Sequence, residues 1–257
     1  GLSGFSRALI AAGICNSKSL IIATEETANA LYHNLKTLGK DVNYFPPAYI
    51  HPYENKPPEV AFAAYRIDSL YRYMTKKNAI LVTCPEAIAF PIIKPEVLKN
   101  GILELSTGME ITPQDISEKL VDLGYVREDL VELLGTFSVR GDVIDIFSPS
   151  FPDPIRIELE WDSISRITLF AAENQCSYEK LNDVYILPSS EWIYPDLLIN
   201  EIKSPENTFS DGLYDLWTGK LSDSLSEINL CGLSEYYSDE TIIFESDDVQ
   251  SDLMKFY

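Results

Sequence analysis

Apolar and polar side chains alternate along the middle of the chain, between residues 135 and 170. A period of two is typical of β-strands that bury one face, and glycines and prolines interrupt the alternation at short intervals. The pattern therefore predicts a meander of short antiparallel strands. We expect these strands at residues 137–140, 143–147, 155–161 and 164–169.

The strand predicted at residues 155–161 has one apolar face and one charged face. Its apolar positions are Ile155, Ile157, Leu159 and Trp161, and its charged positions are Arg156, Glu158 and Glu160. Arg140, in the first strand of the meander, also has the parity opposite to its apolar neighbours. Because successive side chains point to opposite faces of a strand, Arg140 and Arg156 are both expected to face solvent or a partner.

The first hundred residues combine short apolar runs with stretches of helical spacing. The apolar runs of strand length are at residues 19–23, 42–45 and 78–83. Helical spacing is found at residues 3–12, 24–38 and 59–76. Strand, helix, strand, helix, strand with short connections is the order typical of parallel sheets in α/β proteins. This part of the chain is therefore predicted to be an α/β domain.

From residue 102 the pattern changes from α/β to α+β. Thr112 and Pro113 open a helix as its cap and first-turn proline, and the strand meander follows. We place the domain boundaries at such changes of pattern. They predict the first part of an α/β domain, an inserted α+β domain and a return segment, at residues 1–101, 102–188 and 189–257. A short apolar strand at residues 241–244 could rejoin the first sheet, which would make residues 102–188 an insertion.

The charge is distributed unevenly over these three segments. The 257 residues carry a net charge of -20. Residues 1–101 have 11 basic and 8 acidic side chains, residues 102–188 have 6 and 17, and residues 189–257 have 3 and 15. An acidic chain repels phosphate backbones, so the composition argues against an autonomous nucleic-acid binder and favours a basic protein partner.

The chain offers little for catalysis or metal binding. Acidic pairs such as Asp142 with Asp145 accompany no nucleophile or metal motif and are interpreted as solvated faces. With two histidines and no C-x-x-C pair, a metal site is not expected, and reduced thiols that mostly pack in the core are expected at Cys15, Cys84, Cys176 and Cys231. No apolar run approaches the length of a membrane helix and no signal peptide opens the chain. We expect a soluble cytoplasmic fragment of a longer protein, with no cofactor and no membrane contact.

One long pattern in the meander resembles a known family. F-x-V-R-G-D-V-I-D-I-F at residues 137–147 and I-R-I-E-L-x-x-D-x-I at residues 155–164 are similar to the signature of the inserted second domain shared by UvrB and the bacterial transcription-repair coupling factor. The similarity extends from about residue 102 to residue 188 and more loosely over the rest of the chain. It implies the amino-terminal UvrB-like module of a coupling factor, with a degenerate RecA-like parallel sheet and an inserted α+β domain.

The resemblance also implies a function and partners. The module would be a non-catalytic adaptor that recruits UvrA to stalled RNA polymerase in nucleotide excision repair. RNA polymerase and DNA would be contacted by other domains of the full-length protein, which in this family is an ATP-dependent DNA translocase. Two alternatives stay open, a UvrB-type P-loop NTPase and a DNA-damage-binding module.

Two features favour the coupling factor over UvrB. The chain begins where UvrB has its phosphate-binding loop, G-x-x-x-x-G-K-[ST], but Ser6, Arg7 and Ala8 replace the second glycine, the lysine and the hydroxyl residue. Gly4 and these three residues are therefore predicted to form a nucleotide loop that is inactive. The segment at residues 49–72 also leaves no room for the hairpin with which UvrB clamps DNA.

The resemblance assigns partner contacts to three residues of the inserted domain. Arg140 and Arg156 match the arginines with which this domain binds UvrA in both families. The alternative is that each arginine forms only an ion pair across the meander, with Glu158 or Asp142. Trp161 either replaces an aromatic contact that the family has near this position or belongs to the core.

Overall fold

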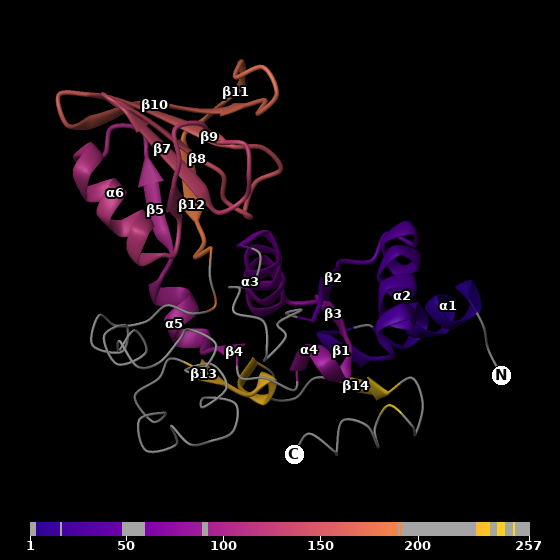
Figure 1. Ribbon diagram of the computed structural model, residues 1–257. Helices are drawn as coiled ribbons and strands as arrows, with labels where there is room; N and C mark the ends of the chain where they lie inside the picture. Colours follow the sequence, from indigo (N-terminus) through magenta and orange to yellow (C-terminus); the bar gives the residue numbers. More distant parts are fainter. Residues whose placement is uncertain are drawn as a thin grey trace, which may run out of the picture. The chain divides into compact units, whose positions relative to one another are not determined.

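The computed structural model describes residues 4–15, 17–47, 60–88, 92–189, 191, 230–236, 241–244 and 249. These residues fall into two compact units, one built on a parallel sheet and the other on a mostly antiparallel sheet (Figure 1). The fold thus combines α/β and α+β parts, and the fold class predicted from the sequence is confirmed.

The first unit contains a four-stranded parallel sheet in the order β14-β1-β3-β2. Its strands are β1 (Ser19–Ile22), β2 (Val42–Phe45), β3 (Ile80–Thr83) and β14 (Thr241–Phe244). All four residues of β1 and of β3 are buried, because strands inside a parallel sheet are covered on both faces. β14 lies beside β1, so the strand predicted at residues 241–244 does join the first sheet.

The three helices predicted in the first hundred residues begin and end close to their predicted positions. They are α1 (Phe5–Ile14), α2 (Glu25–Thr37) and α3 (Val60–Thr75). The Thr24 hydroxyl caps α2 by accepting a hydrogen bond from the Thr27 amide at 3.4 Å. α2 buries Ala28, Leu31 and Leu35, which recur at helical spacing.

Four shorter elements also belong to the first unit. They are α4 (Pro85–Ile88), β4 (Ile92–Ile93), β13 (Leu230–Cys231) and the 3₁₀ helix η1 (Leu233–Tyr236). β4 and β13 form an antiparallel pair. The Tyr236 hydroxyl donates to the Ile93 carbonyl at 2.7 Å, which holds η1 beside that pair.

The second unit contains the strand meander and two further strands that pair with each other. β5 (Leu103–Ser106) and β12 (Asp183–Ile186) form the separate pair, after α5 (Pro95–Asn100). The six-stranded sheet has the order β11-β10-β9-β8-β7-β6. Its strands are β6 (Val126–Arg127), β7 (Thr136–Arg140), β8 (Val143–Ile146), β9 (Ile155–Glu160), β10 (Ser163–Phe170) and β11 (Ser177–Leu181). The four predicted strands are therefore confirmed as β7 to β10.

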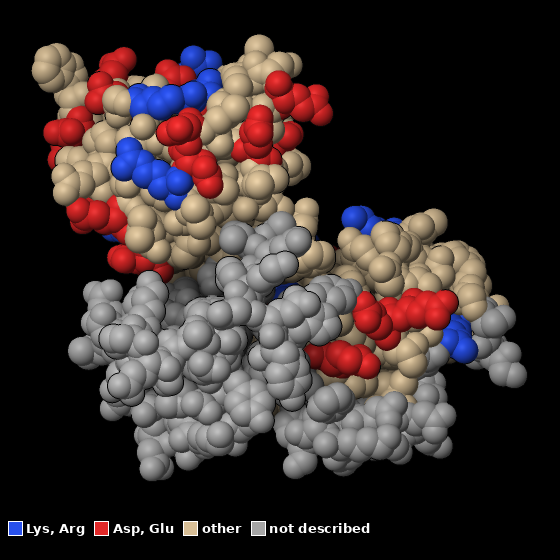
Figure 2. All heavy atoms as spheres, in the orientation of Figure 1, with Lys and Arg blue, Asp and Glu red and all other residues tan. Residues whose placement is uncertain are grey.

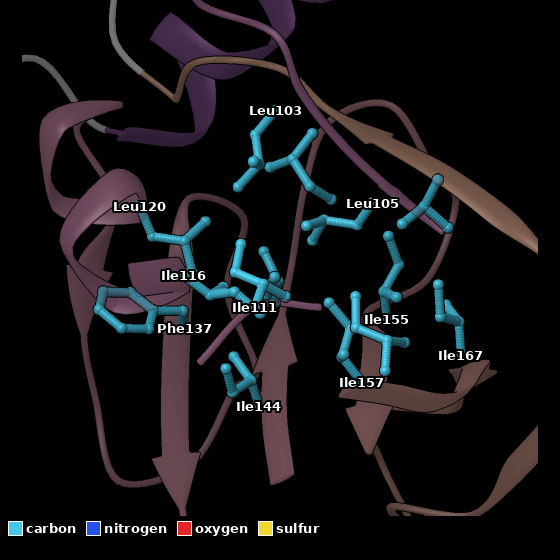
Figure 3. Close-up of a cluster of buried hydrophobic side chains, with 14 of the residues drawn as sticks. Leu103, Leu105, Ile111, Ile116, Leu120, Phe137, Ile144, Ile155, Ile157 and Ile167 are labelled. Atoms are coloured by element: carbon cyan, nitrogen blue, oxygen red, sulfur yellow. The ribbon is translucent and has the colours of Figure 1, made fainter. Parts of the chain in front are cut away.

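One face of the six-stranded sheet packs against α6 (Pro113–Asp122) to form the core of the second unit (Figure 3). Thr112 caps α6 as predicted, and the Asp115 side chain completes a capping box with it. The buried side chains are those of the apolar parity, including Ile116 and Leu120 from α6 and Phe137, Ile144, Ile155 and Ile157 from the sheet. The opposite face of the sheet is therefore left for polar side chains.

The hairpin between β9 and β10 differs from the prediction. Glu160 pairs with Ser163, so Trp161 and Asp162 form a two-residue turn instead of continuing β9. Both have positive φ, 53° and 59°, as a type I′ turn requires. A register shift between Ile164 and Arg166 then lets Ile164 and Ile167 both face the core in spite of their odd spacing.

A buried ion pair in the second unit was not predicted. Arg66 of α3 is grouped with this unit and pairs with Glu191, and their side chains are 2% and 6% exposed. A second bond of this pair, from Arg66 Nη2 to Glu191 Oε2, is 3.2 Å long. The pair ties the start of α3 to the segment after β12. The domain boundaries at residues 102 and 188 stay a prediction.

The described cysteines differ in exposure. Cys15 and Cys84 are buried, and burial raises the pKa of the Cys84 thiol to about 12, whereas Cys176 is exposed. Within the described ranges, no group of three or more metal-ligating side chains is brought together. Among the helices in those ranges, none has the length and hydrophobicity needed to cross a bilayer.

Candidate partner-binding face

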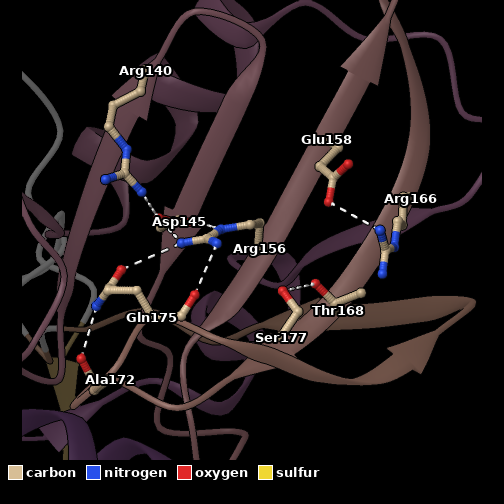
Figure 4. A network of polar contacts seen from close by, with 9 residues as sticks. All are labelled: Arg140, Asp145, Arg156, Glu158, Arg166, Thr168, Ala172, Gln175 and Ser177. Carbon is tan, nitrogen blue, oxygen red and sulfur yellow. Dashed lines mark hydrogen bonds and ion pairs between the residues drawn. The ribbon is translucent and has the colours of Figure 1, made fainter.

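A row of polar side chains crosses the sheet on the face opposite the core. The strand register places Ser138 of β7 opposite Asp145 of β8, Asp145 opposite Arg156 of β9, and Arg156 opposite Thr168 of β10. The Thr168 hydroxyl continues the row to Ser177 of β11 at 3.0 Å (Figure 4). Side chains that face each other across neighbouring strands lie close enough to interact, so this row is a single connected feature.

Asp145 is the centre of the row and is fully buried. Its Oδ1 accepts from Arg156 Nε at 2.7 Å, and its Oδ2 accepts from Arg156 Nη2 at 2.9 Å. Arg140 Nη2 also donates to Oδ2. The interpretation of Asp145 as part of a solvated acidic face is therefore wrong, because two guanidinium groups cover it. Asp142, in contrast, is exposed at the turn.

The Arg156 guanidinium contacts three neighbouring residues. In addition to Asp145, its Nη1 donates to the Gln175 carbonyl at 3.2 Å and its Nη2 to Gln175 Oε1 at 3.3 Å. The guanidinium carbon lies 4.4 Å from the centre of the Phe170 ring, a cation–π distance. The hydrogen bond with Asp145 raises the pKa of the guanidinium. Only 18% of the Arg156 side chain is exposed, so it faces outward as predicted but is largely covered.

Arg140 is the more accessible of the two arginines. Its side chain is 47% exposed, and its single hydrogen bond in the described part of the chain goes to Asp145. A guanidinium has five N–H donors in a planar fork, so most of those of Arg140 are available. The buried carboxylate thus binds one edge of Arg140 (Figure 4), and about half of the side chain stays exposed.

The two arginines do not form the ion pairs that were weighed as an alternative. Neither pairs with Glu158 or Asp142 in the described structure; both pair with Asp145. Glu158 instead faces Arg166 of β10, with 3.7 Å between the closest oxygen and nitrogen. That pair is exposed and long, which is typical of a surface contact of small energy.

Trp161 lies at the tip of the β9–β10 hairpin and is completely exposed. The expectation that it shares a face with Ile155 and Leu159 is wrong, and so is its possible place in the core. Backbone hydrogen bonds fix the tip of the hairpin. The Asp162 carbonyl accepts from the Ile111 amide at 2.8 Å, the Ile164 carbonyl accepts from the Gly108 amide, and the Ile164 amide donates to the Met109 carbonyl. A bulky aromatic side chain with positive φ is rare, and here the two-residue turn imposes that conformation.

The predicted nucleotide-loop remnant lies at the start of α1. Gly4 precedes the helix with a φ of 55°, Ser6 is exposed, and Arg7 is partly buried. Ala8 is fully buried in the apolar cluster that α1 and α2 form with the parallel sheet. A P-loop needs a hydroxyl for Mg²⁺ at this position. The first three residues, residues 49–59 of the segment at 49–72 in which the UvrB hairpin was judged absent, and most of residues 189–257 lie outside the described residues.

The charges on the second unit are mixed in spite of its acidic composition. Figure 2 shows Lys and Arg side chains lying among Asp and Glu side chains on the visible face of this unit. Arg140 and Arg156 share the single carboxylate of Asp145, so this group of three side chains carries an excess of positive charge. A half-exposed guanidinium on such a row can bind a carboxylate of another protein through two parallel hydrogen bonds.

Comparison with known proteins gives the same family as the sequence pattern. Residues 103–192 match the UvrB interaction domain. The chain is 27% identical over 241 residues to the transcription-repair-coupling factor of Myxococcus xanthus, which covers 89% of this chain and 20% of that protein. It is 30% identical over 200 residues to the corresponding factor of Bacillus subtilis, covering 75% of this chain and 17% of that protein.

A second kind of relative is also similar over most of the chain. UvrABC system protein B of Halalkalibacterium halodurans is 29% identical over 273 residues, which covers 94% of this chain and 41% of that protein. The chain therefore spans about a fifth of the two coupling factors and less than half of this UvrB.

Proposed function

Because this chain belongs to the UvrB-like modules that contain a UvrB interaction domain and occur in transcription-repair-coupling factors, we propose that it is an adaptor that binds UvrA. In a longer coupling factor, this module would bring UvrA to RNA polymerase stalled on damaged DNA. RNA polymerase and DNA would be bound by other parts of that protein, and the setting would be the cytoplasm. We assign no catalysis to residues 1–257.

The observation that supports this proposal best is that the Arg140 side chain is exposed and anchored at the same time. Its guanidinium is half exposed and lies within the part of the chain that matches the UvrB interaction domain. A buried carboxylate fixes one edge of it. Such an arginine loses little conformational entropy on binding, and arginine is enriched among the residues that dominate the energy of interfaces.

The proposal is tested by titrating UvrA into the purified chain and measuring heat or fluorescence anisotropy. We expect one binding site, weakened by salt because it includes an exposed cation. UvrB should compete for the same site on UvrA if both use similar domains. An isotherm without saturation at the highest soluble concentrations would exclude the adaptor function.

The alternative of a nucleotide-binding enzyme gives a distinct prediction. If the loop at the start of α1 is inactive, millimolar ATP with Mg²⁺ will leave the melting temperature of the chain unchanged. A ligand at a hundred times its Kd stabilises a protein by about 2.7 kcal/mol, which scanning calorimetry resolves easily. A clear rise in melting temperature would favour a P-loop NTPase, and salt-sensitive binding to damaged duplex DNA would favour the damage-binding alternative.

Trp161 is proposed as a second contact with UvrA, because a completely exposed indole on a firmly held turn is suited to fill an apolar pocket. Its positive φ favours asparagine over tryptophan at this position. We therefore predict that Trp161→Asn raises the stability of the second unit by about 1 kcal/mol and weakens UvrA binding by about tenfold. Thermal melting and titration of the same preparation check both changes, and unchanged binding would remove Trp161 from the interface.

A further inference from the structure

The amino ends of the parallel strands carry a cluster of basic side chains. The helices α1, α2 and α3 end at this edge of the sheet, and a short connection leads from each into β1, β2 and β3. These three connections, together with the last turn of each helix, contain six of the 20 basic residues of the chain and one of its 40 acidic residues. The six basic residues are called the lysine edge and are Lys18, Lys36, Lys40, Arg72, Lys76 and Lys77.

The strand register places the three connections at one level. Ser19 of β1 and Val42 of β2 both pair with Ile80 of β3, so the three strands begin side by side. Neighbouring strands of a sheet lie about 4.8 Å apart, so the starts of β1 and β2 are separated by only about 10 Å. The cations in front of these strands therefore belong to one short edge of the first unit.

Three side-chain contacts join the connections to one another. Lys40 Nζ donates at 3.5 Å to the carbonyl of the residue that caps the end of α1. Lys76 Nζ lies 2.9 Å from Asp41 Oδ2. Lys18 Nζ lies 4.6 Å from the centre of the Tyr73 ring. Each contact links a different pair of connections, so the lysine edge is one continuous surface.

Stabilisation of the helices accounts for only part of this cluster. Lys36 and Arg72 lie in the last turns of α2 and α3, where the helix dipole favours a cation. The other four cations follow the helices, and Asp41 is the one acidic residue in the sequence of the three connections. Six basic side chains and one acidic side chain leave a net charge of +5. Like charges at such short separations repel one another, so this edge is suited to bind an anion.

The opposite edge of the same sheet carries charge of the opposite sign. Glu25 and Glu26 follow β1, Glu86 follows β3, and all three are exposed. Open α/β sheets bind nucleotides at the carboxyl ends of their strands, but acidic side chains there repel phosphate. In this unit the electrostatics therefore favour phosphate groups at the amino ends of the strands instead.

We propose that the lysine edge binds the phosphate backbone of duplex DNA without reading its sequence. The ammonium group of lysine is a compact charge that binds phosphate oxygens, and phosphate contacts carry no direct sequence information. Proteins that bind single strands stack the bases on aromatic side chains. Tyr73 is the one aromatic residue in the sequence of the three connections, and it is buried. A duplex, whose phosphates lie outside, therefore fits this edge better than a single strand.

The contact is expected to be weak, because the chain as a whole carries a net charge of -20. Non-specific DNA binding typically has a Kd of about 1–100 µM at physiological salt, and we expect this range here only at low salt. Such a contact becomes effective where other parts of a longer protein hold the same duplex, since tethering raises the local concentration. The inference goes beyond UvrA binding and concerns the first unit of the chain.

The test is a titration of a fluorescent undamaged duplex of about 20 base pairs with the 257-residue chain, at about 30 mM salt and with anisotropy as the readout. We expect saturable binding that is equal for two unrelated sequences and weakens as salt rises. The double variant Lys36→Glu with Lys77→Glu should raise the Kd by about tenfold or more. It should also reduce the slope of log K against log salt by about 2, because two phosphate contacts are lost.

A matched control is the double variant Lys99→Glu with Lys180→Glu. Both lysines are exposed and lie in the second unit, and the control changes the net charge of the chain by the same amount. Its Kd for the duplex should stay within about twofold of the wild-type value. Melting temperatures show whether each variant is folded. If glutamate at position 36 unfolds α2, Lys36→Gln with Lys77→Gln replaces the first variant and should still raise the Kd by about threefold.

Four outcomes would overturn the inference. The first is no saturable binding at low salt, and the second is equal weakening by the control variant, which would reflect net charge alone. The third is tighter binding to a single strand or to a damaged duplex, because phosphate contacts recognise neither. The fourth is displacement of the duplex by less polyglutamate than unlabelled DNA, compared at equal charge, which would indicate an acidic protein partner. UvrA should bind the Lys36→Glu, Lys77→Glu variant with the wild-type Kd, so loss of DNA binding and failure to bind UvrA are separate results.

Discussion

Replacing Arg156 with alanine will lower the free energy of unfolding of the second unit by about 3 kcal/mol, because the change leaves the buried Asp145 without its main partner. Breaking one half of a buried ion pair costs more than the pair contributes, since the remaining charge stays away from water. The loss of stacking on Phe170 adds to the effect. For a unit of about 100 residues, this corresponds to a fall in melting temperature of more than about 10 °C.

Urea denaturation monitored by circular dichroism measures this loss, and Arg166→Ala is the matched control. Arg166 lies on the neighbouring strand, its side chain is 52% exposed, and its contact with Glu158 is 3.7 Å long. Its replacement should therefore cost less than about 1 kcal/mol. If Arg156→Ala were as mild as Arg166→Ala, the polar row would not be the connected support that its contacts indicate.

Replacing Arg140 with alanine will have the opposite profile, with a small effect on stability and a large effect on binding. Asp145 keeps both bonds from Arg156 when Arg140 is removed, so we expect a loss of stability below about 1 kcal/mol. The affinity for UvrA should fall by about 30-fold or more, since truncating an arginine at the centre of an interface typically costs at least about 2 kcal/mol.

The binding effect is measured by titration and the stability effect by thermal melting of the same samples. Arg140→Lys is an informative second variant, because it keeps the charge but not the planar fork. An intermediate affinity is expected from it. A large fall in melting temperature for Arg140→Ala would contradict the account, since Arg140 would then support the fold instead of presenting itself to a partner.

The strands and helices could be predicted because they are encoded in local periodicity. Ile155 and Ile157 alternate with Arg156 and Glu158 in sequence and do so across β9 in the structure. Thr112 and Pro113 open α6 with a cap and proline that act within one helical turn. The family was also predictable, since its signature is a continuous pattern that the strand meander contains.

The environment of Asp145 could not be predicted, because it depends on contacts between distant positions. Its parity places it on the outward face, as the sequence indicated. Its burial results from Arg156, which is 11 positions away, and the cover over Arg156 comes from Gln175, a further 19 positions along. A local pattern predicts which face of a strand a side chain is on, but not which other residues cover that side chain.

The position of Trp161 was missed for a different reason. Trp161 and Asp162 are not the asparagine and glycine that mark a type I′ turn, so the alternation appeared to continue through residue 161. The turn is instead set by the pairing of Glu160 with Ser163 and by the bond from the Ile111 amide to the Asp162 carbonyl. A tertiary contact here overrides the local preference of the residue.

The most direct test of the account is the affinity of UvrA for three proteins at one moderate salt concentration, wild type, Arg140→Ala and Arg166→Ala. Both variants lose one half-exposed arginine from neighbouring regions of the same sheet, so net charge changes equally. We predict a Kd for Arg166→Ala within about twofold of the wild-type value and a Kd for Arg140→Ala that is about 30-fold higher or more. Equal affinities of the two variants for UvrA would contradict the claim that Arg140 forms the contact.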